Sequence, residues 1–195
     1  MTDLILIISA YLIGSLSMAV IACRLAGLPD PRTQGSGNPG ATNVLRLGGK
    51  QLAAAVLVGD MAKGLLPVLI AKYIGVANMA LALTGLAAFL GHCYPVFFSF
   101  KGGKGVATAL GVILGLSWLI GVMLIVVWIL IATLFHISSL AAISAALVAP
   151  VAALFLMPAP QYTAMVFIIS VLLIWRHRRN IHNLYRGAEP RIGRR

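Results

Sequence analysis

The chain has 195 residues, of which 61% are hydrophobic and 10% are charged, and its formal net charge is +11. About a quarter of the residues of ordinary soluble domains are charged, so this composition excludes a water-soluble globular fold. The lysines and arginines cluster beside apolar segments and lack a soluble fold to present them, so a nucleic-acid partner is not indicated. We therefore predict one membrane domain over residues 1–195.

Six apolar blocks follow one another along the chain, at Leu4–Cys23, Leu52–Ala71, Met79–Phe98, Val106–Phe135, Leu140–Met157 and Tyr162–Trp175. About twenty apolar residues in a helix cross ~30 Å of hydrocarbon, so the first block predicts a span. It follows Asp3 rather than a basic residue, and no small-residue cleavage site precedes Arg24. This pattern favours a retained span over a cleaved signal peptide.

The fourth apolar block is long enough to be one tilted helix or two short helices folded near Gly115, Leu116 and Ser117. Basic residues follow the first, third and last blocks, and the positive-inside rule places all three groups in the cytoplasm. With an external N-terminus this requires an odd number of spans, so the fourth block should cross twice. We expect an all-α protein of seven transmembrane helices, with an external N-terminus and a cytoplasmic C-terminus. Gly111 and Gly115 form a G-x-x-x-G pattern that predicts close helix packing.

Three polar segments face the cytoplasm in this arrangement, and the first of them is rich in glycine. Closely spaced glycines let backbone N–H groups converge on an anion. Arg46 adds a charged fork suited to phosphate, and Ser36 adds a hydrogen-bonding hydroxyl. The further candidate phosphate ligands here are Gly37, Asn38, Gly40, Thr42 and Asn43. The alternative is a plain Gly/Asn turn between two helices.

The second polar segment contains KGGKG, which is not a Walker A motif. Phe98 stands where that motif has its first Gly, and Gly105 stands where it has Ser or Thr. What remains is a glycine turn at the start of a helix, where Gly102 and Gly103 offer N–H groups to a phosphate and Lys104 supplies a point charge. Lys101 is equally well explained as an interface anchor.

The third polar segment contributes His177, with Asn180 one helical turn away. His92 precedes the second segment's glycines, and a lone histidine there is more often structural than catalytic. Asp60 and Lys63 lie inside the second apolar block at i, i+3, where we favour a structural ion pair.

The remaining polar and sulfur-bearing residues give no sign of a metal site. Cys23 and Cys93 lie in or at the end of apolar blocks, without C-x-x-C or a His/Cys cluster at metal spacing, so both should be reduced and structural. The remaining tail arginines are interpreted as membrane-surface charges.

In order and spacing, over nearly the whole chain, the three segments resemble the three motifs of the bacterial acyl-phosphate-dependent glycerol-3-phosphate acyltransferases. The resemblance extends to the D-x-x-K-G of Asp60 to Gly64. It implies an inner-membrane enzyme with a cytoplasmic active site, which makes lysophosphatidic acid and phosphate from acyl phosphate and glycerol 3-phosphate without a cofactor. By motif position the functional residues are Ser36, Arg46, Lys104, His177 and Asn180, and Glu189 holds the tail in place.

The general base and two rival functions stay open. Acidic residues are scarce, so either a histidine or the phosphate of the acyl donor accepts the hydroxyl proton, and we favour the phosphate. A transporter for an organic phosphate would also suit a basic, glycine-lined site, but no halves of the sequence match. A non-catalytic lipid-binding scaffold would not require the Asn/Gly-rich segments. Protein partners are not indicated by any segment.

Overall fold

The computed structural model describes residues 1–192, and within them all regular elements are helices, as predicted. The chain divides into two compact units, Met1–Leu116 and a second unit that begins at Ser117. Two of the tail arginines, Arg194 and Arg195, lie outside the described residues.

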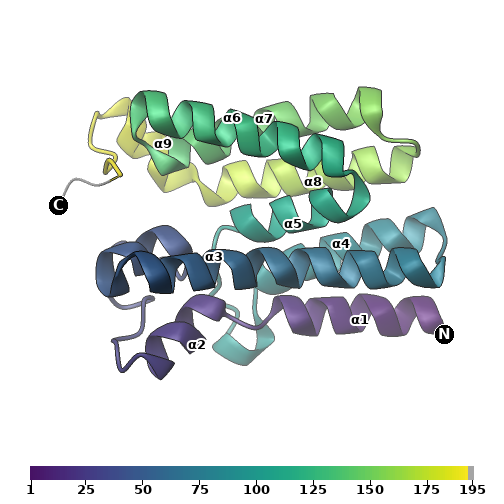
Figure 1. The fold of residues 1–195 in the computed structure, drawn as a ribbon, viewed down its shortest axis with the longest axis horizontal. Helices are drawn as coiled ribbons and strands as arrows, with labels where there is room; N and C mark the ends of the chain where they lie inside the picture. The colour runs from purple at the N-terminus through teal and green to yellow at the C-terminus, as the bar shows by residue number, and fades with distance from the viewer. Residues whose placement is uncertain (193–195) are drawn as a thin grey trace. The chain divides into compact units, whose positions relative to one another are not determined.

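The first unit is built around one long helix. Its elements are α1 (Thr2–Gly14), α2 (Met18–Leu25), α3 (Ala41–Ile74), α4 (Asn78–Cys93), the 3-10 turn η1 (Val96–Phe98) and α5 (Val106–Leu116) (Figure 1). Helix α3 contacts each of the other four α-helices, and α1 packs along α4. The polar loops of this unit therefore start and end on helices that share α3 as a common support.

The first apolar block, predicted as one span, is broken into α1 and α2 with a bend of 44°. The hydroxyl of Ser15 donates to the carbonyl of Tyr11 at 2.8 Å, and Ser17 has an extended backbone. Such side-chain bonds to the preceding turn compete with the helix, which explains why the helix ends here. The freed carbonyl of Leu16 accepts a hydrogen bond from the Lys63 ammonium at 2.7 Å.

Helix α3 is also interrupted, at Gly49, whose φ of 78° and ψ of −175° are not helical. A positive φ favours glycine, because it costs other residues conformational energy. The interruption separates a short polar helix, which follows the first polar loop, from the apolar part of α3. That apolar part contains the predicted block Leu52–Ala71.

The fourth apolar block is two helices, α5 and α6, and the break falls at Ser117, inside the predicted region. The hydroxyl of Ser117 accepts from the backbone N–H of Ile120 as a helix cap. The G-x-x-x-G prediction of close packing is confirmed, because a Cβ added at Gly111 would overlap the carbonyl oxygen of Met61 in α3. Gly64 of α3 lies equally close to the carbonyl oxygen of Thr108 in α5.

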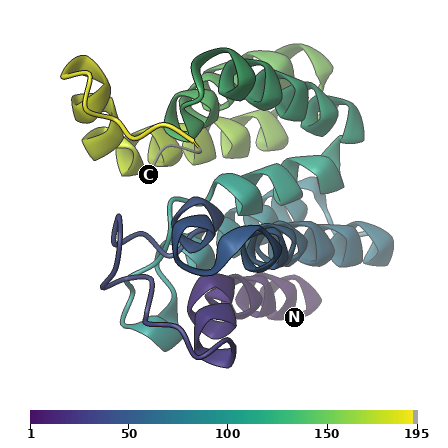
Figure 2. The same cartoon turned by 60° about the vertical axis from the view of Figure 1, so that its left-hand side comes forward.

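The second unit is a smaller helical bundle. It comprises α6 (Trp118–Phe135), α7 (Ser138–Leu156), α8 (Pro160–Arg176) and α9 (Arg178–Tyr185). Helix α7 packs between α6 and α8, and the short α9 touches α7 and α8 (Figure 2).

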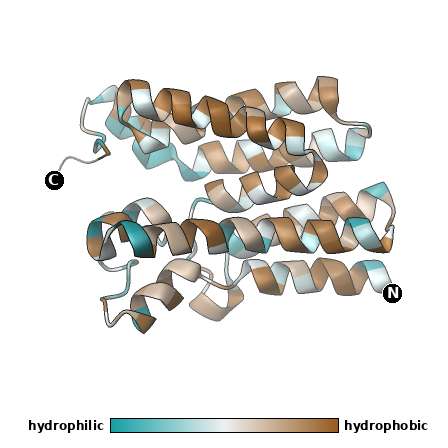
Figure 3. Cartoon of the chain, viewed as in Figure 1, coloured by the Kyte–Doolittle hydropathy of each residue, from teal (hydrophilic) through white to brown (hydrophobic). Residues whose placement is uncertain are grey.

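Large apolar side chains are exposed along the helices, as a membrane protein requires. Leu154 and Phe155 of α7 and Val126 of α6 are more than half exposed. Apolar residues dominate the middle of the helices, and hydrophilic residues gather at helix ends and loops (Figure 3). In water such surfaces would associate, whereas in lipid they face hydrocarbon.

Four of the described helices are long and apolar enough to cross a membrane, and the bent pair α1–α2 would be a fifth crossing. Helices α5 and α8 are apolar but shorter. The chain is thus a multi-pass membrane protein, while the predicted total of seven crossings stays a prediction.

Candidate active site

The first polar loop, between α2 and α3, is folded around the side chain of Asn43. This side chain is buried in the first turn of α3, and its Oδ1 accepts from the backbone N–H of Ser36 at 3.0 Å. Its Nδ2 donates to the carbonyls of Pro31 at 2.9 Å and Gln34 at 3.0 Å. These three bonds show that Asn43 shapes the loop, while its predicted contact with phosphate stays a prediction.

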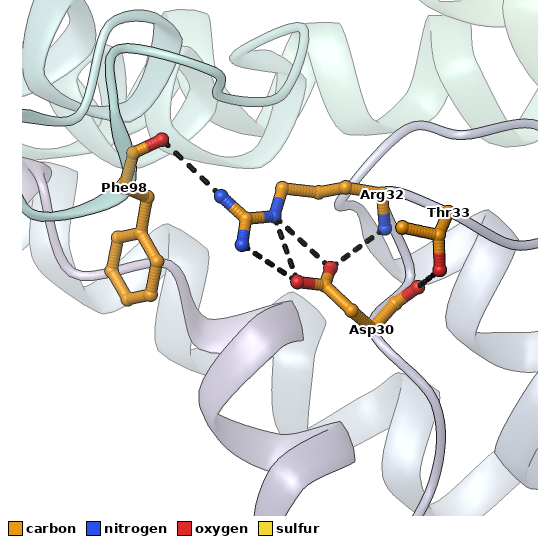
Figure 4. Close-up of polar contacts among 4 residues, drawn as sticks. All are labelled: Asp30, Arg32, Thr33 and Phe98. Atoms are coloured by element: carbon orange, nitrogen blue, oxygen red, sulfur yellow. Dashed lines mark hydrogen bonds and ion pairs between the residues drawn. The ribbon is translucent and has the colours of Figure 1, made fainter.

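A charged clamp ties this loop to the second polar segment (Figure 4). The Arg32 guanidinium donates to both carboxylate oxygens of Asp30, with its shortest contact at 2.6 Å, and to the carbonyl of Phe98 at 3.2 Å. It also lies over the Phe98 ring, 5.6 Å from the centroid. These hydrogen bonds lower the pKa of Asp30, because they stabilise the carboxylate more than partial burial disfavours it.

The second polar segment forms the glycine turn that the sequence predicts at the start of a helix. The turn lies against the end of α4, where the backbone N–H of Gly103 donates to the carbonyl of His92 at 3.2 Å. A Cβ at Gly102 would overlap that same carbonyl oxygen, so the close approach requires glycine. Gly105, with a φ of 86°, ends the turn, and α5 begins at the next residue. Lys104 is half-buried in this turn, whereas Lys101 is exposed.

Both polar segments of the first unit thus lead into helix N-termini. Gly40 caps α3, and Thr42 lies exposed in its first turn. Free N–H groups and the helix dipole favour an anion at such ends. Ser36 and Arg46 are exposed on either side of this N-terminus, where their side chains can reach a ligand in solution. The loop residues Gly37 and Asn38 lie between Ser36 and the cap, and Gly37 has a φ of 68°.

Asp60 and Lys63 form the expected ion pair inside α3. The Lys63 Nζ lies 2.8 Å from Asp60 Oδ1, and both side chains are about 95% buried within the unit. His92 Nδ1 lies 3.5 Å from the same carboxylate oxygen, so the pair is part of a larger buried polar group. Buried charges of this kind persist when they are paired and hydrogen-bonded.

The third polar segment lies in the second unit, where Glu189 is the centre of a hydrogen-bond group. Its carboxylate accepts from the Ser139 hydroxyl and from the Asn180 amide, both at 2.6 Å, and from the Asn183 amide at 3.3 Å. Ser139 lies in the first turn of α7 and the two asparagines belong to α9, so Glu189 joins the chain after α9 to both helices.

His177 is buried at the junction of α8 and α9. Its Nδ1 lies 2.8 Å from the carbonyl oxygen of Leu173, and because a carbonyl only accepts, Nδ1 carries a hydrogen. This contact fixes the orientation of the imidazole ring, so that Nε2 points away from the Leu173 carbonyl. Asn180 follows within α9, as its i+3 spacing predicts.

No group of His, Cys, Asp and Glu side chains that could hold a metal ion occurs within residues 1–192. Cys23 and Cys93 are both buried and neither forms a disulfide, as the sequence predicts.

Two structural features of this site were not predicted from the sequence. The Asp30–Arg32 clamp could have been predicted, because an acidic and a basic residue stand on either side of Pro31 at the start of the loop. Thr108, whose hydroxyl lies 3.1 Å from His92 Nδ1, could not, because its partners are distant in the sequence.

Comparison with known proteins then gives the family. The family model described as glycerol-3-phosphate acyltransferase matches residues 4–187. The chain belongs to the glycerol-3-phosphate acyltransferase family. A glycerol-3-phosphate acyltransferase of Methylococcus capsulatus is 54% identical over 189 residues, which cover 97% of this chain and 96% of that protein. One of Coxiella burnetii is 50% identical and covers 98% and 99% of the two chains.

Two solved structures of PlsY (YgiH), an integral membrane glycerol 3-phosphate acyltransferase, are similar to the whole chain. The glycerol 3-phosphate form has a TM-score of 0.95 and 43% identity, and covers 99% of this chain and 96% of that chain. The lysophosphatidic acid form has a TM-score of 0.92 and 42% identity, and covers the same shares. This chain is therefore an acyltransferase of an integral membrane family, and the transporter and scaffold alternatives are wrong.

Proposed function

We propose that this enzyme transfers an acyl group from acyl phosphate to the 1-hydroxyl of glycerol 3-phosphate. The hydroxyl oxygen attacks the acyl carbonyl, an ester C–O bond forms, and the bond from the acyl carbon to the phosphate oxygen breaks. The products are lysophosphatidic acid and inorganic phosphate. The names of the matched structures, a glycerol 3-phosphate form and a lysophosphatidic acid form, support the acceptor and the product.

One observation carries the proposal: the first unit presents two glycine-rich helix N-termini, each with a basic side chain. Arg46 lies near the N-terminus of α3, and Lys104 lies two residues before the start of α5. Both substrates carry phosphate, and each N-terminus offers N–H groups and positive charge to an anion. An acyl phosphate brings its own leaving group, so the enzyme mainly has to orient two anions and stabilise developing negative charge.

The residue roles are assigned by motif position and supported by placement. Ser36, Arg46 and Lys104 contact phosphate or the developing oxyanion, assisted by backbone N–H groups of Gly37, Gly40, Gly102 and Gly103 and by the side chains of Asn38 and Thr42. His177 and Asn180 are assigned to the same reaction by their position in the third motif. Asp60, Lys63 and Glu189 are structural, which is supported by their ion pair and hydrogen bonds.

The donor phosphate is the proposed general base. It lies next to the attacking hydroxyl in any geometry that permits transfer, and it leaves with the proton as inorganic phosphate. No covalent acyl-enzyme is needed, so Ser36 acts as a hydrogen-bonding ligand and not as a nucleophile.

The proposed setting is a bacterial inner membrane, with one domain over residues 1–195. The family match runs across the boundary between the two units, which supports a single functional domain. Seven crossings are proposed: the bent pair α1–α2 and helices α3 to α8. The N-terminus is outside and the three polar segments are cytoplasmic, which places basic residues on the inner side.

The deciding experiment supplies purified protein with labelled glycerol 3-phosphate and palmitoyl phosphate. Labelled lysophosphatidic acid and one equivalent of phosphate are expected, and palmitoyl-coenzyme A or palmitoyl-acyl carrier protein in place of palmitoyl phosphate should give none. Product from either thioester with the purified enzyme alone would overturn the proposed donor.

A further inference from the structure

His92 joins the buried charges of α3 to the glycine turn before α5. It lies near the end of α4 and is 7% exposed. Its backbone carbonyl accepts from Gly103 and its ring lies beside Asp60 and Thr108. One residue therefore contacts three elements: α3, the glycine turn and α5.

The orientation of the His92 ring follows from its neighbours' hydrogens. The Thr108 hydroxyl donates to the backbone carbonyl of Asp60 at 2.8 Å, because a carbonyl can only accept. The hydrogen shared at 3.1 Å between Thr108 Oγ1 and His92 Nδ1 must then come from Nδ1. The Asp60 carboxylate, 3.5 Å from Nδ1, favours the same hydrogen position.

With Nδ1 held in this way, the opposite edge of the ring meets the turn. A Cβ added at Gly103 would overlap His92 Nε2, and it would lie 3.1 Å from the carbonyl oxygen of Pro39. Pro39 belongs to the first polar loop, directly before the cap of α3. The ring edge of His92 therefore packs where the two phosphate-binding loops meet.

We propose that His92 is a positioning residue, which uses Asp60 and Thr108 to fix the ring that supports the Gly102–Gly103 turn against the first loop. This inference rests on the proposed function, because it assumes that the turn binds a substrate phosphate. Polar partners behind a ligand-binding group commonly set its orientation, and removing them weakens binding while the chemical groups stay in place. Asp60 is then more than a partner for Lys63, since it also orients the histidine.

The test compares His92→Ala, His92→Gln and Thr108→Val with the control Thr84→Val. Thr84 is also buried and its hydroxyl also donates to a carbonyl, that of Ala80 in its own helix, but it lies outside the His92 group. We measure kcat and the KM of each substrate with the other saturating, together with equilibrium binding of labelled glycerol 3-phosphate and competition by inorganic phosphate.

His92→Ala should weaken phosphate binding or raise one KM about tenfold or more, with a change in kcat below about threefold. Thr108→Val should have a smaller effect in the same direction, which nearly disappears in the His92→Ala background because the two residues act as a unit. His92→Gln, whose amide reaches the position of Nε2, should recover part of the loss. Thr84→Val should match the parent in KM and binding.

Three outcomes would overturn the proposal. If His92→Ala lowers thermal stability while KM and phosphate binding stay at the parent values, the residue is only a packing element. If kcat collapses and its pH profile flattens, His92 is a base and not a positioning residue. Equal KM changes in Thr84→Val and Thr108→Val would show that Thr108 has no specific effect on the glycine turn through His92. The binding measurement needs no turnover, so a parent protein that binds phosphate but makes no lysophosphatidic acid contradicts the proposed function alone.

Discussion

At the scale of single residues, three of the four acidic side chains are occupied within their own unit. Asp30 is bound by Arg32, Asp60 is paired with Lys63, and Glu189 accepts hydrogen bonds from Ser139 and Asn180. Asp3 lies in the first turn of α1, remote in sequence from every polar segment. None of these carboxylates is disposed to accept a substrate proton, which supports a base supplied by the donor phosphate.

The basic residues at the two helix N-termini should dominate catalysis. Lys104→Ala and Arg46→Ala should each lower kcat/KM by about 10²-fold or more, because each removes positive charge directed at a phosphate or oxyanion. The measurement is steady-state kinetics on purified variants of parent-like expression. Lys101→Ala is the matched control, since Lys101 is an exposed lysine of the same turn, and it should be much milder. Near-parent turnover in either main variant would contradict its assignment.

His177 tests the identity of the base. If the donor phosphate accepts the proton, His177→Gln should mainly raise the KM for glycerol 3-phosphate, and the dependence of kcat on pH should keep the shape seen in the parent. A histidine base would instead give the parent an acidic limb near pH 6 to 7 in kcat, as is typical of imidazole. Loss of that limb together with about 10²-fold of kcat in His177→Gln would overturn substrate-assisted catalysis.

The Asp30–Arg32 clamp should weaken in acid. The pKa of Asp30 is lowered in the folded protein, so its carboxyl binds a proton less readily there than in the unfolded chain. The clamp therefore contributes its full stabilisation above the unfolded pKa of about 4. That contribution falls away as the pH drops through the lower folded pKa. Hydrogen exchange of the loop between α2 and α3, corrected for intrinsic rates, should therefore accelerate below about pH 4. Asp30→Asn should show the faster exchange already at neutral pH. Unchanged protection from exchange in that variant would contradict the claim that the clamp stabilises the loop.

At the scale of helices, the ion pair of α3 also supports the break in the first span. Lys63 binds Asp60 and, through the same ammonium, the carbonyl of Leu16 that the break leaves without a helical partner. An unsatisfied carbonyl inside a membrane is costly, so one lysine stabilises two irregular features. For variants of this ion pair, thermal stability should therefore be measured before activity is interpreted.

Asp60→Asn should destabilise the protein, because it leaves the Lys63 ammonium buried without its counter-charge. Adding Lys63→Met should recover only part of the loss, since methionine removes the orphaned charge but cannot donate to Leu16. Thermal unfolding in detergent, followed by tryptophan fluorescence, measures both effects. A double variant as stable as the parent but inactive would show that the pair serves function and not structure.

Sequence patterns predicted the helices well where apolar length and the distribution of basic residues decide, and poorly where a few polar atoms decide. The break at Ser117 was expected because the distribution of basic residues required the thirty-residue apolar block to cross twice, whereas the bend at Ser15 depends on one hydroxyl bonding to Tyr11. The glycine turn before α5 was predicted from KGGKG and its helix. The group formed by Asp60, His92 and Thr108 was not, because its contacts join residues 16 to 48 positions apart.

At the scale of the whole molecule, the number of crossings depends on α5. This helix has 11 residues and extends only about 16 Å, too short by itself for ~30 Å of hydrocarbon. Its close packing on α3 through Gly111 and Gly64, however, covers that face of its backbone with protein. Irregular backbone is tolerated at membrane depth where protein covers it. A crossing by α5 together with the turn before it is therefore physically acceptable.

Labelling of single cysteines decides between crossing and re-entry. In a background with Cys23 and Cys93 replaced by alanine, Trp118→Cys should react with a membrane-impermeant maleimide from outside intact cells, and His136→Cys should not. Both native residues are exposed in the structure, and they lie at opposite ends of α6, Trp118 as its first residue and His136 directly after its last. A re-entrant α5 would reverse both results, and it would also place the basic tail outside, against the positive-inside rule. Permeabilised membranes, in which both cysteines must react, are the control, and a labelled His136→Cys in intact cells would rule out seven crossings.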